Sequence, residues 1–359
     1  MSNIEKLNNK ISKGEITSPF SDIDFFKYYN FKVDEFPMGK FYPKGTLIMV
    51  RSATVGEIED ISTVDDLNEE DTEEKVYNLL NSCVKVKYKG DVKPLSYLKD
   101  GDLLYMFFLL KELSFQKSSH LIIKTDCDCG NEAKIELKRG SFKYHDIPFE
   151  IEEYYNEKTA SFLFELNNGK VFNLKLPCVG IKRSFKDYKL VNDDIGENFL
   201  NILQMLLKDT DYIDSDTIDK IINDMERSSM IGIDEFNFLN SVSNYMNFGI
   251  KKAVGKCSCG LDVSTEMAYP SFDQLLALFK LPIDSMIKNK LQISKHYNIS
   301  LSEIDSMPFW KYEESIKIIN ELQEEENKER KKQEKQQQSS NFNPSSYMNK
   351  MSQMGNRFK

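Results

Sequence analysis

The sequence predicts an α+β fold in which helical segments accompany a small antiparallel β unit and a zinc-ribbon-like clasp made of two cysteine knuckles. Three observations lead to this prediction. Apolar residues recur at helical spacing on both sides of one region in which apolar and polar residues alternate. One short cysteine pattern also occurs twice, as Cys127-Asp128-Cys129-Gly130 and as Cys257-Ser258-Cys259-Gly260.

Length and composition limit the classes of protein to consider. A chain of 359 residues with 40% hydrophobic residues is long enough for two or three domains with real cores. The formal net charge of -9 disfavours phosphate-rich partners, so we expect no nucleic acid to bind. The longest apolar run, Leu103 to Leu110, is far shorter than the roughly 20 residues of a membrane span, so we expect no membrane contact. Six cysteines without an export signal indicate a reducing interior such as a bacterial cytoplasm.

The first part of the chain is predicted to hold a docking segment, residues 1–35, and an α+β domain, residues 36–119. In the α+β domain a stretch rich in Pro and Gly leads into a strand, and two helices follow. Carboxylates open the first helix near Glu69, which suits a helix amino end. The second helix, Asp100 to Leu113, is so apolar that we expect it to be buried nearly all round. The docking segment is polar but carries an aromatic cluster that we expect to dock on a partner or on the body: Phe20, Phe25, Phe26, Tyr28, Tyr29 and Phe31.

The middle of the chain is predicted to hold the β unit, residues 120–185, and a helical domain, residues 186–300, each with one knuckle. Alternation of apolar and polar residues begins after the first knuckle. Asn168-Gly169 joins two alternating runs, and this dipeptide favours the positive φ angles of a tight hairpin turn. Helical stripes then fill most of the region from Asn198 onward.

The region 301–337 is predicted to be one helix, amphipathic at first and charged later. Pro308 suits its first turn, and Asp305-Ser306 is the candidate cap. The apolar stripe ends at Leu322, so the remainder should be solvated and supported by charge pairs four residues apart.

Residues 338–359 are predicted to be a disordered polar tail. Two interpretations of this tail remain open, a docking peptide that orders on binding and a passive solubilising extension. Its scattered apolar residues are Phe342, Tyr347, Met348, Met351, Met354 and Phe358.

Cys127, Cys129, Cys257 and Cys259 are the candidate ligands of one structural zinc ion. Two knuckles far apart in the sequence can bring four thiolates to one tetrahedral ion when the chain closes on itself, and four sulfur ligands leave no open position for catalysis. One residue separates each pair, where two to four are usual, but each pair is followed by a Gly that suits a tight knuckle. The alternative is two unrelated surface turns with reduced thiols.

The sequence contains no recognised catalytic pattern. A phosphate-binding loop, a dinucleotide fingerprint, a zinc-protease helix and a nucleophile elbow are all absent from it. We therefore expect no enzyme activity. Trp310 could serve as a ligand platform, but its place on an amphipathic helix favours packing.

Several short segments, taken in their order along the chain, are similar to segments of a known protein family. The similarity covers most of residues 36–330. The segments are Phe36-Pro37-x-x-x-Phe41-Tyr42-Pro43, Val50-Arg51-x-x-Thr54, Leu98-x-x-Gly101-Asp102-Leu103-Leu104, the first knuckle, a hairpin ending in Leu176-Pro177, Asn247-Phe248-Gly249-Ile250-Lys251 before the second knuckle, and Met307-Pro308-Phe309-Trp310-Lys311-Tyr312-Glu313. In this order they resemble the baseplate hub assembly proteins of T-even-type contractile-tailed phages. The resemblance implies a chaperone-like, non-catalytic factor that acts on hub or tape-measure subunits during tail assembly in the host cytoplasm.

The amphipathic part of the C-terminal helix is the predicted partner-binding surface, which would hold a hub or tape-measure helix until it is incorporated. Two alternatives remain: a permanent structural subunit of the virion baseplate, and a zinc-ribbon adapter that binds nucleic acid. The sequence does not indicate the oligomeric state. The predicted partner-binding residues are Phe309, Trp310, Tyr312, Ile316 and Ile319.

Overall fold

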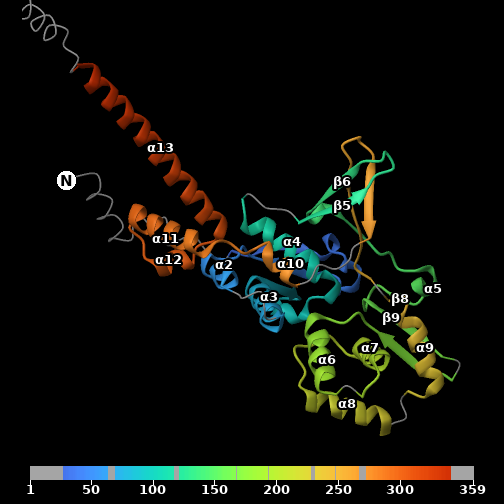
Figure 1. Cartoon of the computed structure of the whole chain (residues 1–359). Coiled ribbons are helices and arrows are strands. Elements are labelled where there is room, and N and C mark those ends of the chain that lie inside the picture. Colours follow the sequence, from blue (N-terminus) through green and yellow to red (C-terminus); the bar gives the residue numbers. More distant parts are fainter. Residues whose placement is uncertain are drawn as a thin grey trace, which may run out of the picture.

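A computed structural model describes residues 27–63, 69–116, 121–166, 168–192, 194–227, 231–246, 248–266 and 272–340. Figure 1 shows a central body, a helical module at one end and a long helix that leaves the body at the other end. The mixture of helices with small antiparallel sheets confirms the predicted α+β class. Phe20, Phe25 and Phe26 of the predicted docking segment, and the tail from residue 341, lie outside the described residues.

The central body is built on a four-stranded antiparallel sheet in the order β1-β2-β3-β4. β1 contains Tyr29 and Phe31, so the end of the predicted docking segment that is described joins this sheet. Every residue from Leu104 to Leu110 of helix α4 is buried, which confirms the expectation for this helix. The elements of the body are β1 (Tyr29–Lys32), β2 (Leu47–Val50), α2 (Val55–Ser62), α3 (Glu69–Cys83), β3 (Val84–Tyr88), β4 (Asp91–Lys93) and α4 (Leu103–Ser114).

Two β-hairpins carry the cysteine knuckles beside this body (Figure 1). A strand follows each knuckle: β6 follows the first, where the alternation predicts it, and β12 follows the second. β7 pairs with β11, so the β unit is shared between distant parts of the chain and is not confined to residues 120–185. The strands concerned are β5 (Leu121–Asp126), β6 (Glu132–Leu137), β7 (Phe142–Tyr144), β11 (Ile250–Lys256) and β12 (Asp262–Glu266).

A third sheet, β10-β9-β8, leads into the helical module. The hairpin predicted at Asn168-Gly169 joins β9 to β10, and Gly169 has a φ of 79°, the positive value that the turn requires. The module has a small apolar core of its own around Phe185 and Leu203. The elements are α5 (Phe149–Glu152), β8 (Tyr155–Asn156), β9 (Ser161–Glu165), β10 (Val171–Leu174), α6 (Val179–Val191), α7 (Glu197–Leu206), α8 (Ser215–Arg227) and α9 (Ile233–Ser243).

Glu235 fixes the start of α9 to the Asn168-Gly169 turn. Its carboxylate accepts hydrogen bonds from Asn168 Nδ2 (2.9 Å), from Lys170 Nζ (2.8 Å) and from the backbone N–H of Gly232 (3.0 Å). The Lys170 ammonium group lowers the pKa of Glu235 to about 2. The ionised carboxylate is therefore what links the helix to the hairpin.

We expect Glu235→Gln to lower the melting temperature at neutral pH by about 3 °C, because the three hydrogen bonds to the ionised carboxylate are weakened or lost. A carboxyl group with a lowered folded-state pKa stabilises the protein above its unfolded-state pKa, and this contribution is lost as the pH falls toward the folded-state value. The difference between the two proteins should therefore shrink as the pH falls from about 5 toward 2. Thermal unfolding at several pH values checks this. A difference that stays constant over that range would contradict it.

The C-terminal helices begin with α10 (Phe272–Ala277), α11 (Ile283–Tyr297) and α12 (Leu301–Asp305). The predicted cap at Asp305-Ser306 is wrong, because these residues end α12 and do not cap the next helix. Asp305 instead forms an ion pair with Lys290 of α11 (2.5 Å), and Lys290 also pairs with Glu59 of α2 (2.6 Å). These pairs fix α11 and α12 to the body.

The last helix, α13 (Phe309–Ser340), leaves the body as predicted (Figure 1). It runs three residues beyond the predicted limit at residue 337. From Glu321 to Glu334 every side chain is exposed, and pairs such as Lys328–Glu324 (3.9 Å) and Arg330–Glu334 (3.4 Å) lie four residues apart. None of the described helices combines the length and apolarity needed to cross a membrane.

Short 3-10 helices complete the described chain. They lie at Val33–Glu35, Gly39–Phe41, Leu95–Tyr97, Asp100–Asp102 and Arg139–Ser141.

Candidate metal centre and helical groove

The first cysteine knuckle is the turn between β5 and β6. The backbone N–H of Cys127 donates to the carbonyl of Asn131 (3.1 Å), and the N–H of Gly130 donates to the carbonyl of Cys127 (2.8 Å). Gly130 has a φ of 82°, a value at which a side chain would be strained. The turn therefore needs its glycine, and it holds Cys127 buried and Cys129 exposed.

The second knuckle, between β11 and β12, repeats this geometry. Cys257 N–H donates to the carbonyl of Leu261 (2.9 Å), and Gly260 N–H donates to the carbonyl of Cys257 (2.9 Å). Gly260 has a φ of 90°, and again the first cysteine, Cys257, is buried while Cys259 is exposed. Two turns of the same construction thus present two sulfurs each.

The four sulfurs meet, as predicted. Cys127 Sγ lies 3.7 Å from Cys259 Sγ, and Cys129 Sγ lies 3.8 Å from Cys257 Sγ. All four sulfur atoms lie within 4.8 Å of one another. A tetrahedron of sulfurs around zinc, with Zn–S bonds of about 2.3 Å, has edges of about 3.8 Å. The spacing of the donors therefore fits a metal ion bound by four thiolates.

The chemistry of the donor set also suits a metal. All four cysteines are free thiols, and soft sulfur ligands select zinc, Cu(I) and iron–sulfur clusters. The backbone N–H of Cys259 has the largest influence on Cys257, and against the effect of burial it lowers the pKa of this thiol to about 6. In the same cluster the pKa of Cys127 is raised to about 12 and that of Cys259 is raised, so the proton is shared unevenly among the thiols, and a metal would have to displace the remaining protons.

The hairpins that carry the knuckles pack closely against each other. A Cβ atom at Gly255 of β11 would lie 3.1 Å from Cγ1 of Ile135 on β6, which is tighter than ordinary packing. Ile135, Ala133 and Ala253 are buried at this contact, with exposed fractions of at most 2%. This apolar contact holds the two hairpins side by side and so brings the knuckles together.

A second candidate site is an apolar groove between α11 and the first half of α13. The groove has a volume of about 440 Å³, with Leu281, Pro282 and Met286 on one side and Phe309, Tyr312 and Ile316 on the other. Tyr312 Oη donates to the carbonyl of Met286 (3.2 Å) and fixes the two helices together at the groove floor.

The five predicted partner-binding residues have different environments. Phe309, Tyr312 and Ile319 are buried within the chain, and Phe309 and Tyr312 also line the groove. The three side chains are buried because the same stripe packs α13 on the body, where the rings of Phe115 and Phe309 lie 4.7 Å apart. Trp310 is half-buried outside the groove. Ile316 is half-buried and lines the groove, so it is the most accessible of the three predicted residues found there.

Sequence reasoning did not identify α11 as the second wall of the groove. Its buried stripe, Met286, Lys290 and Ile293, has helical spacing and was a readable signal. The groove exists because α13 packs beside α11. This contact joins two separate helices, so the pattern within either helix does not predict it.

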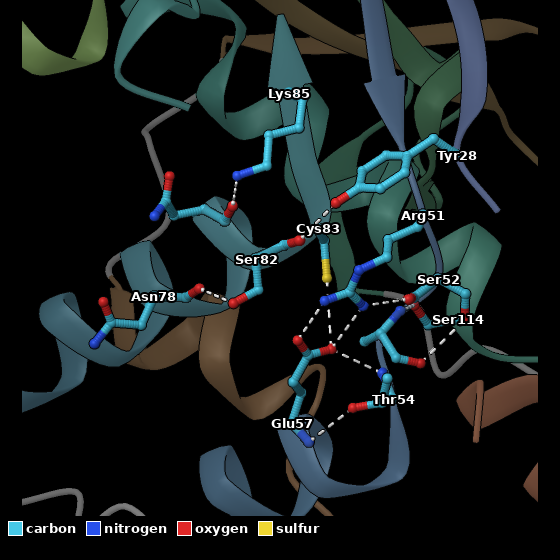
Figure 2. A network of polar contacts seen from close by, with 12 residues as sticks. Tyr28, Arg51, Ser52, Thr54, Glu57, Asn78, Ser82, Cys83, Lys85 and Ser114 are labelled. Atoms are coloured by element: carbon cyan, nitrogen blue, oxygen red, sulfur yellow. Dashed lines mark hydrogen bonds and ion pairs between the residues drawn. The ribbon is translucent and has the colours of Figure 1, made fainter. Parts of the chain in front are cut away.

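A network of polar contacts centred on Arg51 and Glu57 lies next to the segment that leads into α13, and Figure 2 shows it from close by. Arg51 donates to both carboxylate oxygens of Glu57 (2.9 and 2.6 Å), and the backbone N–H of Thr54 donates to Oε2 of Glu57 (2.8 Å). The Cys83 thiol lies 3.7 Å from Oε2 of the same carboxylate. Burial opposes ionisation of Glu57, but Arg51 holds the pKa of this carboxyl below its usual range. Burial raises the pKa of Cys83, so its thiol stays protonated and unreactive.

This network continues into the start of α13. Thr54 forms a β-bridge with Pro308. The backbone N–H of Val55 donates to the carbonyl of Met307 (3.0 Å), and that of Phe309 donates to the carbonyl of Ala53 (2.8 Å). The segment around Arg51 and the start of α13 are therefore one structural unit.

Other segments that carry the family resemblance also contact one another. Asp102 accepts hydrogen bonds from Tyr42 Oη (2.7 Å) and from the backbone N–H of Met38 (2.8 Å). Lys99, between Leu98 and Gly101, donates from Nζ to the carbonyl of Leu176 (2.8 Å). Burial raises the pKa of Asp102 to about 7. Met38, Lys99 and Leu176 are largely buried and line a cavity of about 280 Å³, so these segments of the chain pack around a small internal space.

No family model, curated protein or solved structure matches the chain.

Proposed function

We propose that this chain is a non-catalytic assembly factor of a contractile phage tail, which binds a helix of a hub or tape-measure subunit in the infected host cell. The observation that carries the proposal is the apolar groove between α11 and α13, at the base of a helix whose outer half is solvated. Amphipathic helices bind in apolar grooves through side chains spaced three and four residues apart. The ordered resemblance of residues 36–330 to baseplate hub assembly proteins supplies the tail context.

One structural zinc ion is the proposed cofactor. Cys127, Cys129, Cys257 and Cys259 would hold it, and a closed shell of four sulfurs would supply cross-linking but no catalysis. The ion would link the two knuckles, which lie at the two ends of the segment from Cys127 to Cys259. The body would then present a rigid platform to the subunit bound in the groove.

The charges on the knuckle hairpins argue against the nucleic-acid adapter. Lys124 pairs with Glu132 across β5 and β6 (2.9 Å), and Lys256 lies 4.0 Å from Asp262 across β11 and β12. Nucleic-acid binding needs lysine and arginine gathered on one face without neighbouring acids. The hairpins instead interleave both signs, which favours protein partners.

Photo-crosslinking in infected cells tests the proposal. A photoreactive residue in place of Ile316, inside the groove, should capture a hub or tape-measure subunit. The same residue in place of Ile318, which is 41% exposed on α13 but outside the groove, should not. Capture of no tail protein at position 316 would contradict the proposal. Mass spectrometry of purified virions separates the roles, because a transient factor should be absent from them and a permanent baseplate subunit should be present.

A further inference from the structure

The groove between α11 and α13 combines an apolar floor with an acidic outer edge. Leu281, Met286 and Ile316 are among its apolar lining residues. Glu321 and Glu324 of α13 line the outer end, and each lies 3.9 Å from an exposed lysine of the same helix, Lys317 or Lys328. Glu313 is a third carboxylate of the lining, in which Lys317 is the basic residue. An occupant that matches this chemistry needs apolar side chains on one face and basic side chains beside them.

The C-terminal residues of the chain have this composition. Residues 341–359 include Lys350, Arg357 and Lys359 and contain no Asp or Glu. Met351, Met354 and Phe358 recur at the spacing of one helical face. Methionine adapts its shape to irregular apolar surfaces, which suits a segment that must bind reversibly.

The length of the chain allows these residues to reach the groove of the same molecule. α13 ends at Ser340, 16 residues beyond Glu324 at the outer end of the groove, which is a distance of about 24 Å along a helix. The ten residues 341–350 span about 33 Å when extended. Met351 can therefore arrive at the groove, and Met348 remains in the connecting stretch.

We propose that residues 350–359 occupy the groove of their own chain and are displaced when the partner helix binds. The inference rests on the proposed function of the groove, and it adds regulation to that site. The bound segment covers an apolar surface that would otherwise promote self-association. The basic residues beside the apolar ones pair with the acidic edge of the groove, so binding weakens at high salt.

Oxidation of methionine by dilute peroxide in the full-length protein, followed by peptide mass spectrometry, tests this proposal. Covered methionines oxidise slowly, and Met348 provides an internal reference in the same segment. Met351 and Met354 should oxidise at least about fivefold more slowly than Met348. Ile316→Glu should abolish this protection, and the matched variant Ile318→Glu should keep it.

A variant of the tail keeps the test independent of the fold of the body. Phe358→Asp should expose Met351 and Met354 while the melting temperature of the protein stays unchanged. Equal oxidation of all three methionines in the wild-type protein would overturn the proposal. Protection that grows with protein concentration would also overturn it, because the occupant would then be the tail of a second copy. Neither result alters the outcome of crosslinking in infected cells, so the two proposals can fail separately.

Discussion

Replacing Cys129 and Cys259 together by Ser is expected to lower the melting temperature by roughly 5 to 10 °C and to abolish metal binding. Both residues are exposed, so the substitution removes two ligands without creating a buried cavity. The loss follows because the two knuckles are about 130 residues apart in sequence, and opening a cross-link across so long a loop restores much entropy to the unfolded chain. Thermal unfolding and metal analysis of the purified variant measure both effects.

Asp128→Asn provides the matched control. It changes an exposed residue of the first knuckle that supplies no sulfur, so metal content and melting temperature should stay at wild-type values. Treatment of the wild-type protein with a strong chelator should reproduce the double cysteine variant. A double variant as stable as the wild type would show that apolar packing alone holds the hairpins together and that the four-cysteine clasp does not stabilise the protein.

Removing the guanidinium group of Arg51 is expected to have the second large effect. Arg51→Met should lower the free energy of unfolding by about 3 kcal/mol, because Glu57 would be left as a partly buried carboxylate without its cation. The damage should be greatest where α13 joins the body, since Thr54 both contacts Glu57 and bridges Pro308. Urea unfolding measures the change in the free energy of unfolding. Hydrogen exchange at residues 309–319 measures the local destabilisation where α13 joins the body.

A double-mutant cycle separates the ion pair from the packing of the Arg51 side chain. Glu57→Gln alone should destabilise less than Arg51→Met, because a neutral amide tolerates burial better than an unpaired charge. Adding Glu57→Gln to Arg51→Met should recover part of the stability. If the two effects simply add, Arg51 and Glu57 do not act as a pair and the explanation is wrong.

The helices and knuckles were predictable because their signals are local in the sequence. The continuous apolar run of α4 and the Asn168-Gly169 turn can each be recognised within a dozen residues, and both predictions are confirmed. The contact of Cys127 with Cys259 was predictable although the two residues are far apart in the sequence, because the same cysteine pattern occurs in both places. The identity of the bound ion stays a prediction.

The sheet pairings were not predictable from local patterns. β3 alternates clearly, with Val84 and Val86 buried, yet nothing in its sequence indicates β2 as its neighbour. β7 pairs with β11, which follows it by about 100 residues, so the β unit could not be delimited from residues 120–185 alone. Such contacts depend on how separate elements pack together.

The prediction that Asp305-Ser306 caps the start of α13 was wrong, and the sequence contains the reason. Ser300 and Glu303 form a reciprocal capping box, in which Ser300 Oγ accepts from the N–H of Glu303 (3.2 Å). This pattern begins α12 five residues before the predicted cap. Asp305 and Ser306 therefore belonged to the end of one helix, although they also resemble the start of another.

Native mass spectrometry of the full-length protein, expressed with zinc in the medium, tests the central claim that the four thiol groups form one metal clasp. We expect one zinc ion per chain, which is absent after Cys127→Ser and retained after Cys83→Ser, since Cys83 lies in the separate Arg51–Glu57 network. A wild-type chain that carries no metal, with all four knuckle thiols free to react with an alkylating reagent, would contradict it.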